Sequence, residues 1–281
     1  MLRTGRFYSI PYLSLATLCS LIIADPYPSA LLVAVALLVP LCFAVGIAAL
    51  NDLLHISRDL RAGRGRTTDR NWLLGLTIGG SVSALGCAGL GGLSMIFGLL
   101  GSLIAGVLYA LWKSIPLVSN LVRGLTTTVL LLGAAGMGGG FVSALLFAVG
   151  VGILDSAGNL WGDVRDQEVD QRAGTITIAT LYPSLAPWLA IGLHAVATTL
   201  LATITPFVWL GLPLGILLLK APSLRVHEHF LQLKYLTFAV IGISLAPAFP
   251  LALVIICLSL LVVPASMLYR RIHTPATPLT P

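Results

Sequence analysis

One short segment, from Asp163 to Gly174, is charged in a sequence that is otherwise mostly apolar. Within it, Asp163, Asp166 and Asp170 follow the spacing i, i+3, i+7, which would stack three carboxylates on one face of a helix. Like charges held so close repel one another unless a cation lies between them. The spacing therefore predicts a cation site, and we expect a metal ion to occupy it.

A second polar segment, from Asn51 to Gly63, aligns with the first at a constant offset. The aligned positions are Asp52, His55 and Asp59 in one segment and Asp163, Asp166 and Asp170 in the other. This echo indicates two related helical halves, as in the internal repeats of transporters. Opposed carboxylates would form an oxygen cage suited to Mg²⁺, which takes few protein ligands and adds substrate phosphates. The alternative is that the acids are ordinary solvated loop residues that balance nearby arginines.

A third polar signal combines Tyr109, Lys113 and Asn120. Tyr109 and Lys113 lie one helical turn apart, so an amine and a hydroxyl could bind diphosphate oxygens beside the carboxylates. Taken alone, a Tyr and a Lys at a helix end are more typical of membrane-interface anchors.

The polar face of the Asp163 segment continues backward along the same helix through Asn159 and Asp155, at i−4 and i−8. We expect this face to line a cavity, with Asn159 in contact with substrate. Asp155 is either part of that lining or a structural hydrogen-bonding residue. The sequence favours His194 as an internally bonded helix contact rather than a catalytic residue.

The composition is that of a membrane protein, since 57% of residues are hydrophobic, only 9% are charged and the mean hydropathy is +0.99. The net charge of +6 reflects Lys and Arg in the short connections between apolar runs, which indicates topology and not nucleic-acid binding. The four cysteines are scattered singly, without metal or disulfide spacing.

Apolar runs long enough to span a bilayer predict an all-α, polytopic membrane bundle of nine or ten transmembrane helices, with two related four-helix halves around a central cavity. The expected spans are 7–24, 29–50, 72–90, 92–111, 119–136, 141–158, 184–202, 204–220, 234–249 and 251–268. The basic connections, including the one that ends at Lys234, would all face the cytoplasm together with the motifs. We expect one domain over 1–281, with 274–281 as a disordered tail.

The motifs together resemble those of the UbiA superfamily of intramembrane prenyltransferases. That family carries Asn-Asp-x-x-Asp-x-x-x-Asp after its second helix, Tyr-x-x-x-Lys after the fourth and Asp-x-x-Asp-x-x-x-Asp after the sixth. The matching residues are Asn51, Asp52 and Asp59, then Tyr109 and Lys113, then Asp163, Asp166 and Asp170, followed by Gly174 and Thr177 of a Gly-x-x-Thr ending. His55 departs from the pattern, because imidazole is a poor ligand for a hard cation.

The resemblance implies an integral membrane enzyme that uses Mg²⁺ to ionise a polyprenyl diphosphate and transfers the prenyl group to an aromatic or other small acceptor. It implies metal ligation by Asp52, Asp59, Asp163, Asp166 and Asp170, catalytic roles for Asp163, Asp166, Lys113 and Tyr109, and substrate binding by Asn51, Asn120, Asn159, Arg58 and Arg172. Two alternatives are a terpene cyclase on the same scaffold and a transporter or lipid-binding protein that uses the carboxylates for cation coupling.

Overall fold

The structure is a computed structural model that describes residues 10–61, 69–112, 115–172, 174–220 and 223–247, together with 250, 257 and 261. Every regular element in these residues is a helix. This follows from the apolar composition, because a segment in lipid must satisfy its backbone hydrogen bonds within itself. The expectation of an all-α protein is confirmed.

The first five helices carry two of the three motifs. They are α1 (Ile10–Ala24), α2 (Ala30–Arg61), α3 (Arg70–Leu90), α4 (Leu93–Leu111) and α5 (Val118–Met137). The turn between α3 and α4 consists of two glycines, and Gly92 has a φ of +82°, which side chains rarely adopt. The connection between α3 and α4 is therefore short, and these two helices run antiparallel.

The second part of the chain begins with α6, the helix that carries the third motif. Its elements are α6 (Leu145–Arg172), α7 (Ile178–Leu181), α8 (Ala186–Leu201), η3 (Pro206–Leu210), α9 (Gly211–Leu217), η4 (Leu218–Lys220) and α10 (Ser223–Leu245). The elements η3, α9 and η4 follow one another without a break and occupy the expected span 204–220.

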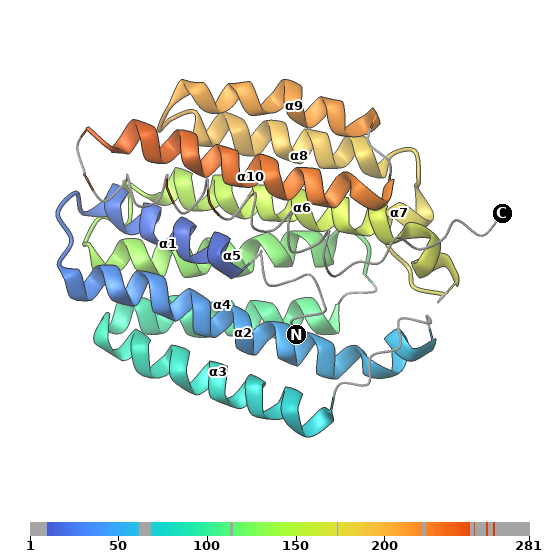
Figure 1. Cartoon of the computed structure of the whole chain (residues 1–281), viewed down its shortest axis with the longest axis horizontal. Helices are drawn as coiled ribbons and strands as arrows, with labels where there is room; N and C mark the ends of the chain where they lie inside the picture. Colours follow the sequence, from blue (N-terminus) through green and yellow to red (C-terminus); the bar gives the residue numbers. More distant parts are fainter. Residues whose placement is uncertain are drawn as a thin grey trace.

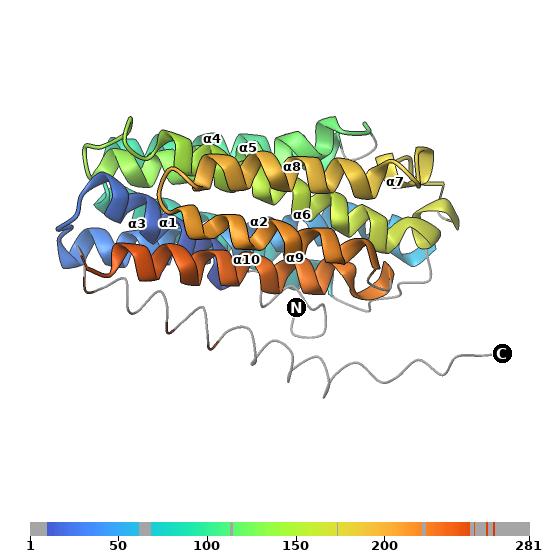
Figure 2. The same ribbon diagram turned by 90° about the horizontal axis from the view of Figure 1, so that it is seen from above.

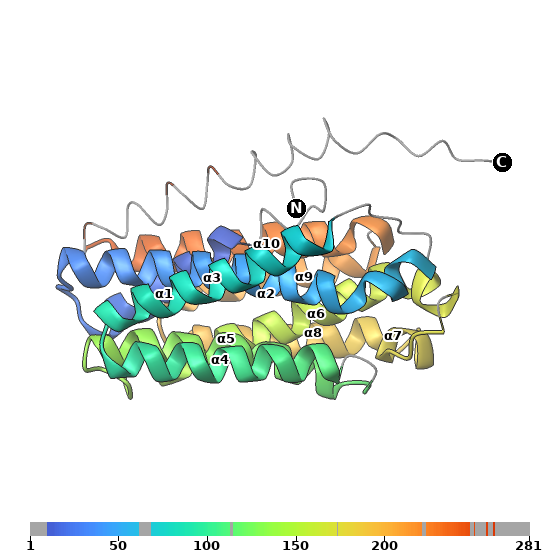
Figure 3. The same cartoon turned by 90° about the horizontal axis from the view of Figure 1, so that it is seen from below.

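The long helices lie side by side along one axis, and successive helices reverse direction (Figure 1). The C-terminal ends of α2, α4 and α6 therefore meet at one end of the bundle, beside α7. Seen from above and below, α4, α5 and α8 form one layer and α2, α3, α9 and α10 another, with α6 between them (Figures 2 and 3). This arrangement places all three sequence motifs at the same end.

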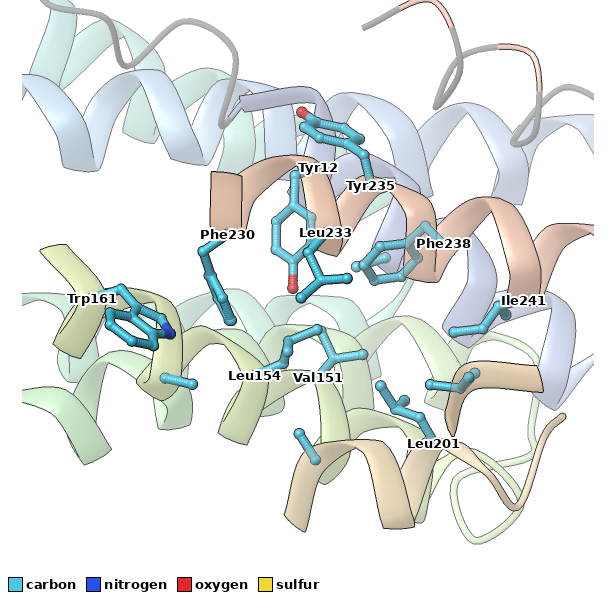
Figure 4. Packing of buried hydrophobic residues seen from close by; sticks show 14 of the residues in the cluster. Tyr12, Val151, Leu154, Trp161, Leu201, Phe230, Leu233, Tyr235, Phe238 and Ile241 are labelled. Atoms are coloured by element: carbon cyan, nitrogen blue, oxygen red, sulfur yellow. The ribbon is translucent and has the colours of Figure 1, made fainter. Parts of the chain in front are cut away.

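An aromatic cluster joins α1, α6 and α10 in the core (Figure 4). The ring of Phe238 packs edge-on against Tyr12, with ring centroids 5.1 Å apart, and against Phe147 at 6.4 Å. Such pairs contribute about 0.5–1.5 kcal/mol beyond the apolar area that they bury. The cluster packs α10 against α6, the helix that carries Asp163, Asp166 and Asp170.

Small residues allow α4 and α5 to cross closely. A Cβ atom at Gly98 would lie 2.6 Å from the Cα of Gly133, closer than real Cβ contacts. Helices in lipid associate largely through such close packing, because apolar side chains gain little by leaving lipid tails.

Five of the described helices are long and apolar enough to cross a membrane, namely those containing 30–54, 70–90, 93–111, 118–137 and 145–172, and shorter apolar helices accompany them. Almost all of the expected last span, 251–268, lies outside the described residues, as do 274–281. The count of nine or ten therefore stays a prediction.

The expected start of the ninth span at residue 234 is wrong, because α10 begins at Ser223 and Lys234 lies inside it. Lys234 is 5% exposed and does not belong to a basic connection. The helix tolerates this buried ammonium group because it pairs with Asp155 of α6.

Candidate active site

The helix α6 extends through the charged segment as far as Arg172, so Asp163, Asp166 and Asp170 lie on one helix as expected. Asp155, Asn159 and Asp163 follow one another at four-residue intervals on one face. Asp155 is buried, whereas Asn159 and Asp163 are half-buried nearer the motif end. The polar face thus runs from the protein interior to the end where the motifs meet.

Three helices contribute to a chain of hydrogen bonds that ends on Asp163. The hydroxyl of Tyr109 on α4 donates to Oδ1 of Asn159 on α6, at 3.0 Å. Nδ2 of Asn159 donates to Oδ1 of Asn120 on α5, and Nδ2 of Asn120 donates to Oδ2 of Asp163 at 3.2 Å. Four of the residues predicted from the sequence are therefore brought together.

Asp166 forms an ion pair with its neighbour Arg165. The guanidinium group donates from Nε and from one terminal nitrogen to the two carboxylate oxygens, both at 2.8 Å. Both side chains are about 30% exposed, so water screens part of the attraction. Asp170 lies further along α6 and is 7% exposed. Arg165 was not among the residues predicted from the sequence, although its place between Asp163 and Asp166 made it a candidate.

Arg172, predicted to bind substrate, is exposed at the end of α6. Its guanidinium group lies 3.8 Å from the carboxylate of Glu168, also exposed, and nothing described brings it to Asp163. Beyond it the chain turns at Gly174, which has a φ of +66°. The side chain of Thr177 then caps α7 by accepting from the backbone N–H of Thr180. In the Gly-x-x-Thr ending, Gly174 thus makes the turn that follows α6, and Thr177 caps the start of α7.

The first motif lies on the last turns of α2. Asn51 and Asp52 are half-buried there. The side chains of 55 and 57–61, which include His55, Arg58 and Asp59, lie outside the described part of the structure, and so does Lys113. Their predicted roles remain predictions.

The donor set at this end of the bundle consists of carboxylate and amide oxygens, which hard cations prefer. Among the described side chains, no group of three His, Cys, Asp or Glu residues is close enough to hold a metal ion alone. Mg²⁺ usually takes only one or two carboxylates from a protein and completes its shell with water or substrate phosphates.

Comparison with known proteins agrees with this geometry. The model of the UbiA prenyltransferase family matches residues 13–235, which is most of the chain. The chain belongs to the UbiA prenyltransferase family. No curated protein matches it.

Solved structures of UbiA homologues share the fold. The apo structure of a homologue from Aeropyrum pernix K1 has a TM-score of 0.68 and 18% identity, over 84% of this chain and 95% of that one. A homologue from Archaeoglobus fulgidus bound to GPP and Mg²⁺ has a TM-score of 0.61 and 16% identity, over 94% and 99% of the two chains. A homologue from Archaeoglobus fulgidus bound to DMAPP and Mg²⁺ has a TM-score of 0.57 and 16% identity, over 94% of this chain and 98% of that one.

Deeper in this UbiA fold, a buried polar cluster joins four helices. Asp155 on α6 accepts from the ammonium group of Lys234 on α10 and from the hydroxyl of Thr127 on α5. The ammonium nitrogen also lies 3.6 Å from the ring centroid of Tyr12 on α1. Sequence reasoning left the role of Asp155 open and missed its partners. The available signal was that Asp155 stood alone in an apolar run, where ionisable residues usually pair.

His194 packs inside the UbiA bundle, away from the motif end. It is 2% exposed, and its ring meets that of Phe230 edge-on with centroids 5.5 Å apart. The absence of a Cβ at Gly215 leaves room for the imidazole, because a Cβ there would lie 3.3 Å from it. His194 is therefore a helix-packing residue, but the expected internal hydrogen bond is not found at its Nδ1, which has no partner among the described residues.

Proposed function

We propose that this chain is a Mg²⁺-dependent intramembrane prenyltransferase that ionises an isoprenyl diphosphate, transfers the prenyl group to a small acceptor and releases diphosphate. One observation carries the proposal: side chains from α4, α5 and α6 converge on Asp163 at the end where the motif-bearing helices meet. Membership of the UbiA prenyltransferase family and the homologues bound to GPP or DMAPP with Mg²⁺ support it.

The residues proposed to hold the cation come from both aspartate motifs. They are Asp52 and Asp59 on α2 and Asp163, Asp166 and Asp170 on α6. Mg²⁺ bound there would neutralise charge on the diphosphate and make it a better leaving group. His55 replaces an acid in the α2 set, so we assign most of the anchoring to α6.

The protein's own groups would bind and orient the diphosphate. Lys113, two residues after the end of α4 in the sequence, is proposed to stabilise negative charge as the C–O bond breaks. We propose that Asn51, Arg58 and Arg172 bind phosphate oxygens around it. Apolar helix walls would then keep water from the allylic cation until the acceptor attacks.

The wider setting is also proposed. We infer a bundle of nine or ten transmembrane helices in two related halves around a cavity, with the motif end on the cytoplasmic side of the bilayer. The whole chain, 1–281, would act as one domain.

Trp161 is 2% exposed and lies inside the bundle, whereas Phe97 and Trp72 are 67% and 60% exposed and would face lipid. Trp161 is therefore the better candidate for a residue that limits the size of the substrate.

Product analysis tests the proposal. Purified protein in detergent is incubated with Mg²⁺, a labelled isoprenyl diphosphate and a membrane lipid extract as the source of acceptors, and the products are analysed by mass spectrometry. A transferase gives acceptor-derived masses increased by the prenyl group. Hydrocarbons or simple terpene alcohols in the hexane extract would instead indicate a cyclase. Intact diphosphate with no product would favour a transporter or lipid-binding protein.

A further inference from the structure

Asn120 and Asn159 connect Tyr109 to Asp163. We infer that the two asparagines are positioning residues for the Asp163 carboxylate rather than substrate ligands, and that Tyr109 acts through them. This inference rests on the proposed function, because it assumes that Asp163 binds the cation.

The donor-to-acceptor direction of these three hydrogen bonds follows from the Asp163 carboxylate at one end of the series. An ionised carboxylate can only accept, so Asn120 must present its Nδ2 group to Asp163. Its amide oxygen then faces Asn159, which must present its own Nδ2 group in turn. The amide oxygen of Asn159 is left facing Tyr109, whose hydroxyl must donate. Each bond fixes the orientation of the next.

Burial makes this chain of hydrogen bonds a rigid one. Asn120 is 1% exposed, and Tyr109 and Asn159 are half-buried. Hydrogen bonds are electrostatically stronger in such surroundings than in water, and linked bonds polarise one another. Because α4, α5 and α6 each supply a member, the chain also fixes how these helices sit around the carboxylate. The plane of the Asp163 carboxylate is therefore set before any cation arrives.

Tyr109 gains a different role from the one that the motif suggested. A tyrosine hydroxyl has a single proton, and here that proton points to Asn159. It is therefore not available to a diphosphate oxygen while the chain is intact. Residues that orient a metal ligand in this way typically change metal affinity or activity by about 10–100-fold when they are removed.

Binding of Mn²⁺ alone, with no diphosphate present, tests the inference. Free Mn²⁺ is counted by electron paramagnetic resonance in titrations of the full-length protein in detergent. We expect Asn120→Ala to weaken Mn²⁺ binding by about 10–100-fold and Tyr109→Phe to weaken it by a smaller factor. The double variant should match Asn120→Ala, because the Tyr109 hydroxyl no longer reaches Asp163 once the chain is cut.

Ser156→Ala is the matched control. Ser156 is also buried on α6, but its hydroxyl bonds only to the carbonyl of Gly152 in the same helix among the described contacts, so Mn²⁺ binding should not change. Tyr109→Phe keeps the aromatic ring and carries the test if Asn120→Ala yields little folded protein.

Three outcomes would overturn the inference. If Asp163→Asn abolishes Mn²⁺ binding but Tyr109→Phe and Asn120→Ala bind like wild type, the positioning role is wrong and the proposed function stands. Additive losses in the double variant would show that Tyr109 and Asn120 act separately, which also contradicts it. If wild type binds Mn²⁺ no better than Asp163→Asn, the cation site and the proposed function fail together.

Discussion

Replacement of Lys234 by methionine should destabilise the bundle strongly, because it leaves a buried carboxylate without its cation. Asp155 is 6% exposed, and after the change the hydroxyl of Thr127 is its one remaining described donor. Methionine keeps most of the packing of the lysine stem, so the loss is mainly electrostatic. Breaking a buried ion pair by removal of one partner costs about 3–5 kcal/mol. The contact of the ammonium group with the Tyr12 ring adds to this loss.

The assay uses Cys19, whose side chain is fully buried on α1, as a reporter of opening. Cys42, Cys87 and Cys257 are first replaced by serine, so that only Cys19 can react with a maleimide. When closing is faster than labelling, the labelling rate follows the population of the open form. A loss of 3–5 kcal/mol should therefore raise that rate by about 100-fold or more, if the opening that exposes Cys19 also separates α10 from α6.

Two further variants identify the cause. Lys220→Met removes an exposed ammonium group at the end of η4 and should change the rate by less than about threefold. Lys234→Met combined with Asp155→Leu removes both charges and should recover most of the stability, because apolar replacement of a whole buried pair is often neutral or favourable. A labelling rate for Lys234→Met close to that of the parent, or a double variant as unstable as the single one, would refute the reasoning.

Other predictions concern helix packing and the cation. Gly98→Ala places a Cβ atom against the Cα of Gly133 and should cost about 1–3 kcal/mol of stability, whereas Gly86→Ala, with open space around its Cβ, should cost little; thermal unfolding in detergent compares them. Arg165→Gln removes the ion pair in which Arg165 competes with Mg²⁺ for Asp166. It should lower the Mg²⁺ concentration for half-maximal diphosphate release by about two- to fivefold, since a partly exposed pair is worth about 0.2–1 kcal/mol. A higher Mg²⁺ requirement would contradict this competition. Removal of divalent ions with EDTA should abolish diphosphate release, and added Mg²⁺ should restore it; release that persists in EDTA would exclude a metal requirement.

Much of the fold could be predicted from the sequence because the membrane restricts it. Apolar runs must be helices, so the runs before residue 220 were located closely. The i, i+3, i+7 spacing placed Asp163, Asp166 and Asp170 correctly on one helix. These features depend on local sequence alone.

The contacts between distant helices could not be predicted in the same way. Lys234 looked like a loop residue because a lone lysine normally ends an apolar run, and its partner Asp155 lies far away in the sequence. Asn120 and Asn159 were both identified, but their hydrogen bond depends on how α5 and α6 cross. Sequence spacing within one helix gives no information on that crossing.

Release of diphosphate from an isoprenyl diphosphate tests the central claim most directly. The purified protein, Asp163→Asn and the control Asp69→Asn are compared at saturating Mg²⁺. Asp69 is exposed and caps the start of α3, so its amide variant should keep the wild-type rate. We predict Mg²⁺-dependent release by wild type and the control, and a loss of at least about 100-fold in Asp163→Asn. Equal rates of release in all three proteins would contradict the assignment of Asp163 to the cation site, and no Mg²⁺-dependent release by wild type would contradict the assignment of the chain to this chemistry.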